Sequence, residues 1–162
     1  SGCLTLVALL PDGGGQSFPE FRRRLEKKLS DQASSILAFP GKIRVIEPAL
    51  LEISVNALLG VSDVDSMALT EKEAVDRLNQ FLDSINGNRG GKGWEIGRFP
   101  HISVFYSLLK TIRTVNYVEK VSMTVYLVED GMRKEIDLAS VSRYPHGIVA
   151  NGSHQVAVKV IA

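Results

Sequence analysis

Hydrophobic positions along the chain follow two spacings, and these predict its strands and helices. Residues 3–10 are a short apolar run that ends at Pro11-Asp12 and three glycines, which predicts a strand followed by a loop. A second extended segment starts at Ile43 and is interrupted by Pro48. Apolar side chains then alternate over residues 51–61, which predicts a long strand with one buried face. The polar positions between them are Glu52, Ser54 and Asn56.

Two amphipathic helices are predicted, each with a capping box at its start. In the first, Glu20 follows Ser17 by three positions, and Pro40-Gly41 ends the helix. In the second, Glu73 follows Thr70 in the same way, and Asn86-Gly87 ends the helix. The apolar stripes of the two helices are Phe21, Leu25, Leu29 and Ile36, and Ala74, Leu78, Leu82 and Ile85.

The second half of the chain predicts one short helix and three strands. Residues 102–112 carry apolar and aromatic side chains at helical spacing after Pro100. Residues 121–127 and 132–138 alternate on either side of Asp130-Gly131, a pair typical of a tight hairpin turn. Residues 156–160 form a last alternating run.

This order of elements predicts an α+β fold made of two small α/β sandwich subdomains with mainly antiparallel sheets. Residues 1–87 follow the order β-α-β-β-α and are predicted to form an N-terminal split-βαβ-like subdomain. Residues 101–162 follow the order α-β-β-β and are predicted to form a C-terminal subdomain. Residues 88–100, rich in glycine and holding the only tryptophan, are interpreted as the connecting loop.

Charge and composition narrow the classes of function. The 162 residues carry 19 basic and 18 acidic side chains, a net charge of +1. Proteins that hold nucleic acid or an anionic membrane usually carry a basic excess, so we expect neither partner. Cys3 is the only cysteine, which excludes an intramolecular disulfide. No apolar run approaches the length of a membrane-spanning helix.

Eight of the 14 glycines fall in two clusters, Gly13 to Gly15 and Gly87 to Gly97, and phosphate-binding loops are also rich in glycine. The first cluster lies between a strand and a helix but matches neither the P-loop nor the dinucleotide-binding spacing. The second is one residue short of the P-loop spacing, and Gly93 stands where the metal-binding hydroxyl is needed. We therefore expect no nucleotide site and no cofactor.

The remaining candidates for chemistry are isolated side chains. His101, His146, His154 and Cys3 show no pairwise spacing typical of a zinc site, so no metal is expected. Ser103 lies near His101 but in no nucleophile elbow, and no placed carboxylate completes a triad. These patterns predict no catalytic residue, and ordinary surface or hydrogen-bonded histidine is the favoured interpretation.

Two further features suggest contacts with a partner. The first is a basic run with interleaved acids on the first helix, for which a solvated face is favoured and a charged contact to a protein is second. Its members are Arg22, Arg23, Arg24, Lys27 and Lys28. The second is Trp94, which either anchors an interface or packs back on the core and fixes its loop.

The segment around Trp94 resembles the baseplate J-like family, whose members are wedge proteins of contractile phage tails and related injection machines. The resemblance is carried by a Gly-Trp-x-x-Gly-Arg turn and the short helix and strand entry that follow it, and it covers about residues 11–160. Thr114 stands where the family usually has a glycine before a valine, so the turn there is expected to be looser. The segments concerned are residues 90–98, 103–109, 115–121, 44–55 and 147–156.

The resemblance implies the C-terminal portion of a non-enzymatic structural protein of the baseplate. Its implied partners are other baseplate or tail proteins or another copy of itself, and its implied location is the bacterial cytoplasm during assembly and then the tail of a virion or phage-tail-like particle. The residues it marks for interface or fold-defining contacts are Gly93, Trp94, Gly97, Arg98, Phe105 and Tyr106. The alternative is a stand-alone α/β binding module for RNA or a small ligand, for which polar residues on the exposed face of the long strand are unfavourable.

Overall fold

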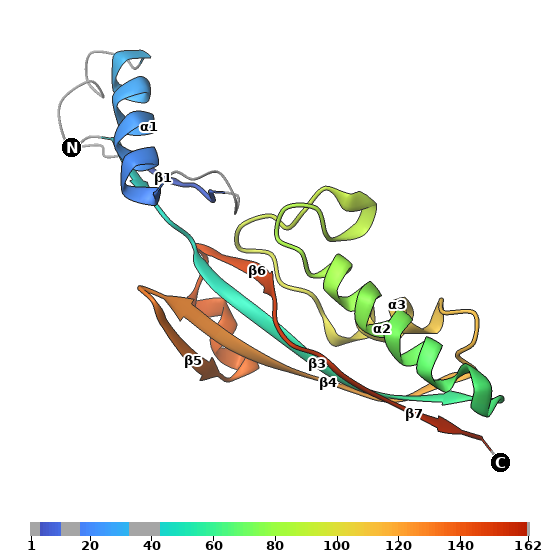
Figure 1. The fold of residues 1–162 in the computed structure, drawn as a ribbon. Helices are drawn as coiled ribbons and strands as arrows, with labels where there is room; N and C mark the ends of the chain where they lie inside the picture. Colours follow the sequence, from blue (N-terminus) through green and yellow to red (C-terminus); the bar gives the residue numbers. More distant parts are fainter. Residues whose placement is uncertain (1–3, 11–16, 33–42, 162) are drawn as a thin grey trace. The chain divides into compact units, whose positions relative to one another are not determined.

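The computed structural model describes residues 4–10, 17–32 and 43–161 and divides the chain into two compact units, residues 1–48 and 49–162. The predictions that involve Cys3, Gly13 to Gly15, Ile36 and Pro40-Gly41 lie outside the described residues. The α+β fold class is confirmed, because helices and strands are mixed along the chain and two strand pairs of the main sheet are antiparallel (Figure 1).

The first unit is a β-α-β arrangement. Strands β1 (Leu4–Val7) and β2 (Ile43–Ile46) pair in parallel, and helix α1 (Phe18–Gln32) lies between them in the sequence. The helix begins directly after Ser17, the predicted N-cap, and its predicted apolar stripe is partly buried. Glu26 on the same helix accepts a hydrogen bond from the Val45 N–H at 2.9 Å.

The second unit is built on one five-stranded sheet with the order β5-β4-β3 and then β6 and β7, which both pair with β3. The 13-residue strands β3 (Ala49–Val61) and β4 (Tyr117–Glu129) are antiparallel and form its centre. Strand β5 (Met132–Ile136) returns antiparallel to β4 through a turn at Asp130-Gly131, where both residues have positive φ. Strands β6 (Gly147–Asn151) and β7 (Gln155–Val160) run parallel to β3, one after the other.

One face of this sheet carries the core. Helices α2 (Met67–Phe81) and α3 (Ile102–Lys110) cover it beside β3, β4 and β7 (Figure 1). A smaller apolar cluster on the same face involves Val141 and Tyr144 at the 3₁₀ helix η3 (Leu138–Arg143). Two short 3₁₀ helices, η1 (Val64–Ser66) and η2 (Arg89–Gly91), lie before and after α2. The buried strand positions are the alternating apolar residues that the sequence predicts for residues 51–61.

The predicted division into subdomains of residues 1–87 and 101–162 is corrected by the sheet. Strand β3 belongs to the first of those ranges, yet all of its partners, β4, β6 and β7, belong to the second. Residues 49–162 therefore share one core, and the glycine-rich residues 88–100 are a loop within it and not a boundary. The observed division comes after Pro48, the proline that interrupts the extended segment.

The predicted capping box of the second helix is also corrected. Helix α2 begins at Met67, so Thr70 lies inside its first turn and not at its N-cap. The Thr70 hydroxyl donates to the Ser66 carbonyl at 2.7 Å, and Glu73 pairs with Arg77 one turn later. The helix ends at Phe81, so the predicted stripe is longer than the helix, and Ile85 is exposed in the turn that follows.

Candidate functional site

The loop of residues 88–100, called the Gly-Trp loop below, is attached to the core through the Trp94 ring. The ring is half-buried, and its indole N–H donates to the carbonyl of Phe81, the last residue of α2, at 2.9 Å. The two rings meet edge-to-face with centroids 5.3 Å apart. The backbone N–H of Trp94 donates to the Ser84 carbonyl at 3.0 Å. Trp94 therefore makes fold-defining contacts, the second of the two roles that the sequence leaves open.

Glycine is required at two positions of this loop. Gly93 is buried with a φ of +79°, and a Cβ there would lie 2.4 Å from the Ile85 carbonyl oxygen. Gly97 has a φ of +82°, and a Cβ there would lie 2.9 Å from the Pro145 carbonyl oxygen. Both values are too short for a carbon–oxygen contact and both φ angles disfavour side chains. Both glycines of the motif are therefore needed because the loop backbone passes close to a backbone carbonyl at each of them.

Three side chains of the loop are exposed to solvent and are called the outer ridge below: Glu95, Ile96 and Arg98. The side chains of Arg98 and Glu95 are 76% and 79% exposed and form a weak ion pair at 3.4 Å. Ile96 between them is 38% exposed. The backbone beneath is held by the Gly97 N–H, which donates to the Gly147 carbonyl at 2.8 Å. A rigid base therefore presents an apolar and a charged side chain to solvent.

The other two residues marked by the resemblance serve the core and the sheet. Phe105 on α3 is fully buried and stacks edge-to-face on Phe81 with centroids 6.0 Å apart. Tyr106 is 36% exposed, and its hydroxyl accepts a hydrogen bond from the Val121 N–H of β4 at 3.1 Å. Strand β5 pairs only with residues 125–129 of β4, so this hydroxyl satisfies a strand N–H beyond the end of β5.

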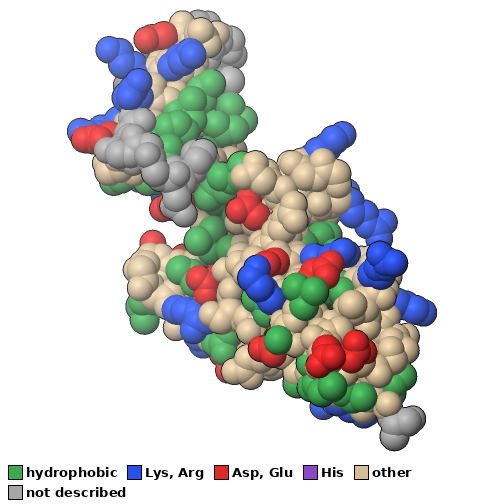
Figure 2. Space-filling view, turned by 45° about the vertical axis from the view of Figure 1, so that its right-hand side comes forward, with side chains coloured by type: hydrophobic (Ala, Val, Ile, Leu, Met, Phe, Trp, Pro, Cys, Tyr) green, Lys and Arg blue, Asp and Glu red, His purple; other side chains and the backbone are tan. Residues whose placement is uncertain are grey.

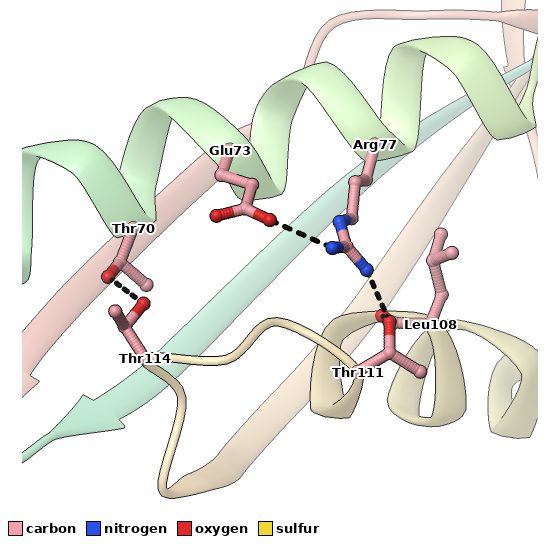
Figure 3. Close-up of polar contacts among 6 residues, drawn as sticks. All are labelled: Thr70, Glu73, Arg77, Leu108, Thr111 and Thr114. Carbon is pink, nitrogen blue, oxygen red and sulfur yellow. Dashed lines mark hydrogen bonds and ion pairs between the residues drawn. The ribbon is translucent and has the colours of Figure 1, made fainter.

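A polar network joins α2 to the connection between α3 and β4 (Figure 3). The Thr114 hydroxyl lies 2.6 Å from that of Thr70, and Thr70 is fully buried. Because Thr70 gives its proton to a backbone carbonyl, Thr114 donates in this pair. Arg77 bonds both Glu73 and Thr111. Thr114 does not have positive φ, so its backbone does not require glycine at this position. Its hydroxyl instead makes a specific hydrogen bond with Thr70.

This pair gives a stability prediction. Replacing Thr70 by valine is expected to lower the free energy of unfolding by about 1 kcal/mol, because the Thr114 hydroxyl loses its partner in a partly buried place. Replacing both threonines by valine is expected to cost less than the sum of the single changes. Urea unfolding of the four proteins of this double-mutant cycle measures the coupling. Strict additivity would contradict the proposed pairing.

A polar junction between β6 and β7 was not predicted from the sequence. The two strands pair with different halves of β3 and leave the N–H of Val55 without a strand partner. The His154 Nδ1 accepts that N–H at 3.0 Å, so its proton must be on Nε2, which lies 2.6 Å from the Asn151 side-chain oxygen. The Asn151 amide in turn donates to Asn79 on α2 at 2.9 Å. Burial lowers the pKa of His154 to about 4.

The surface of the second unit is hollowed beside the β6–β7 junction and beside Arg98. An open groove of about 590 Å³ lies beside the β6–β7 junction and is lined by His154 and polar residues of β3 and β4. Arg98 and Phe99 line two further hollows. One, of about 390 Å³, also includes Trp94, Arg89 and His101. The other, of about 610 Å³, is called the Arg98 hollow below and is lined mainly by apolar side chains.

The histidines considered for catalysis or metal binding have ordinary partners. His101 is the N-cap of α3, and its Nδ1 lies 3.0 Å from the exposed Ser103 hydroxyl. His146 lies 3.6 Å from a Glu129 oxygen. In the part of the chain that the structure describes, no group of three or more His, Cys, Asp or Glu side chains could hold a metal ion.

The remaining surface features are charged. Lys and Arg side chains gather over α1 with acidic side chains among them (Figure 2).

The sheet face opposite the helices carries two tyrosines, each beside a cation. The Arg133 guanidinium lies 3.7 Å from the Tyr126 ring centroid and pairs with Glu52 at 2.9 Å. Lys159 lies near the Tyr117 ring, and its hydrogen bond to Glu119 raises the Lys159 pKa.

Comparison with known proteins gives no family assignment. No protein-family model matches the chain, and no curated protein matches its sequence. Within residues 4–10, 17–32 and 43–161, no helix has both the length and the apolar character needed to cross a membrane. The Gly-Trp loop with its outer ridge is the candidate functional surface that the hydrogen bonds of the described residues define best.

Proposed function

We propose that this chain is a structural component of a phage-like tail baseplate and makes protein–protein contacts while the baseplate of a contractile injection machine assembles. Two observations on one segment support this. The first is the resemblance of residues 90–98 and the segments after them to baseplate J-like proteins. The second is the geometry of the same segment.

The observation that carries the proposal is the outer ridge on its fixed base. Hydrogen bonds on both sides of the turn, at Trp94 and at Gly97, hold the backbone, so the ridge needs little ordering when a partner binds. Arginine is enriched at the centres of protein interfaces, and an exposed aliphatic side chain beside it adds apolar surface that binding can bury. Arg98 and Ile96 supply this combination.

The proposed role needs no catalytic residue, cofactor, metal, nucleic acid or membrane, since an assembly protein acts through its shape and contacts. Its partners would be other baseplate or tail proteins, or another copy of the same chain. It would reside in the bacterial cytoplasm during assembly and then in the tail of the virion or tail-like particle. The basic face of α1 offers these partners a second, charged contact.

The test is assembly in a host whose gene cluster encodes tail, sheath and spike proteins beside this one. Replacing Ile96 by serine together with Arg98 by glutamate is expected to abolish or strongly reduce sheathed particles counted by electron microscopy. Both side chains are exposed, so the purified variant should unfold at the wild-type temperature.

The matched control is Arg89→Glu, a charge reversal in the same loop at a residue outside the ridge, which should assemble normally. Normal particle numbers from the ridge variant, or a gene neighbourhood without tail proteins, would refute the proposal.

An RNA-binding module is the second candidate, and the tyrosines on the open sheet face are what favour it. Such modules stack bases on exposed aromatic side chains of a sheet. The Tyr126 ring is already covered by the Arg133 guanidinium, which in turn pairs with Glu52, and this weakens the case. Salt-sensitive retardation of random RNA in a gel, lost in a Tyr126→Ala variant, would favour this candidate over the baseplate role.

A further inference from the structure

The Arg98 hollow lies where the Gly-Trp loop meets the segment around η3. Leu51, only 2% exposed, is among its lining residues, and half-buried Phe99, Val141 and Tyr144 enclose it further. Leu138 also lines it and is 49% exposed. A volume of about 610 Å³ falls in the range of ligand-binding pockets. The hollow therefore offers apolar surface, partly in contact with water, to a bulky group.

The walls of the hollow are fixed before anything binds. The Gly97 N–H donates to the Gly147 carbonyl at 2.8 Å, and the Gly147 N–H donates to the Tyr144 carbonyl at 2.9 Å. The Tyr144 N–H donates to the Val141 carbonyl at 3.0 Å. This chain of backbone hydrogen bonds connects the two sides of the hollow. Binding there costs little reorganisation, as in other pre-formed sites.

Charge decides what kind of group fits beside the apolar surface. Among the residues that the structure describes, Arg98 is the only charged one that lines the hollow. Its pairing with Glu95 is long, at 3.4 Å, and highly exposed, so it contributes little and is readily exchanged for another carboxylate. Near the hollow in sequence, Asp137 and Arg143 have opposite charges and do not line it. The complementary ligand thus carries a carboxylate next to an apolar body.

We propose that the Arg98 hollow binds a segment of a partner protein in which a bulky aliphatic or aromatic side chain stands beside an acidic residue. The apolar side chain would fill the space between Leu51, Phe99 and Leu138, and the carboxylate would bind the Arg98 guanidinium. This inference rests on the proposed function, because it takes the occupant to be a partner protein. It goes beyond that function by naming the chemistry of the contact.

Selection of random peptides displayed on phage, with the purified 162-residue chain as bait, tests the proposal. We expect enriched sequences to place Leu, Ile, Phe or Trp within two positions of Asp or Glu. Fluorescence anisotropy of a synthetic peptide from this set is expected to show about tenfold weaker binding to Arg98→Glu, where repulsion replaces attraction. Leu138→Ser is expected to weaken it severalfold.

The matched control is Arg89→Glu, which reverses a charge in the same loop but outside the hollow and should bind like the wild type. The inference is overturned if no peptides are enriched, if the enriched peptides lack the apolar–acidic pair, or if they bind Arg98→Glu as tightly as the wild type. Concentration-dependent dimers in sedimentation velocity that the Arg98→Glu and Leu138→Ser changes dissociate would assign the hollow to a second copy, which also overturns it.

A separate experiment tests the proposed function: co-purification of this chain with the tail proteins of the same gene cluster. If those proteins bind the Leu138→Ser variant, which changes the hollow and leaves the outer ridge intact, as they bind the wild type, the inference fails and the baseplate role stands. If the peptides behave as expected and no tail protein binds the wild type, the baseplate role fails and the peptide site stands.

Discussion

Replacing Trp94 by alanine is expected to lower the free energy of unfolding by about 3 kcal/mol, near the low end for tryptophan-to-alanine changes because the ring is half-buried. The change removes the edge-to-face contact with Phe81 and the hydrogen bond to its carbonyl. It also detaches the Gly-Trp loop from the end of α2. Urea unfolding followed by circular dichroism measures the effect.

Trp94→Phe is the matched control. It keeps an aromatic ring against Phe81 and loses only the indole N–H, while the Phe81 carbonyl still accepts from the Asn88 N–H at 2.8 Å. The expected cost of this variant is about 1 kcal/mol. Equal costs for the two variants would show that ring packing contributes nothing and would contradict the role given to Trp94.

Acidification from pH 7 to pH 4 is expected to remove about 1–2 kcal/mol of stability through His154 alone, a value reduced from the full pKa shift because the ring is partly exposed. The imidazole titrates near 6.5 in the unfolded chain and near 4 in the folded protein. Between these values the unfolded state binds a proton that the folded state does not, so stability falls as the pH falls. A proton on Nδ1 would also break the bond from the Val55 N–H.

The matching variant is His154→Gln, which keeps a side-chain acceptor and cannot titrate. Carboxylates also titrate in this range, so the measured quantity is the difference in pH dependence between the wild type and this variant. We expect the wild type to lose the additional stability between pH 6.5 and pH 4 and the difference to level off below pH 4. Parallel curves for the two proteins would contradict the neutral state of the partly buried His154.

The local elements were largely predictable because their signals lie in short stretches of sequence. Alternation over residues 51–61 identified β3, and Asp130-Gly131 identified the hairpin between β4 and β5. Ser17 marked the start of α1 correctly. Thr70 failed as the start of α2 because its hydroxyl can bond either the N–H groups of a helix start or a carbonyl one turn earlier, and the structure shows the second arrangement.

The sheet and the site depended on contacts between distant residues. Nothing in the local pattern shows that β3 pairs with three strands from the other half of the chain, so the predicted division at residues 88–100 was misplaced. Gly93, Trp94 and Gly97 were singled out as a motif, but only the packing shows that Trp94 faces inward and that its neighbours form a ridge. His154 could not be distinguished by spacing, since its partner Val55 lies 99 positions away.

The sequence by itself determined the strands, the helices, the α+β class and a Gly-Trp segment with unusual backbone demands. These follow from periodicity, turn residues and φ preferences, which act over a few neighbouring residues. The tertiary structure alone decided which strands share a sheet, where the compact units divide and which side chains of the loop reach solvent. These outcomes depend on burial of apolar surface and on hydrogen bonds between segments far apart in the chain. Local conformational preferences do not show which distant segments will meet.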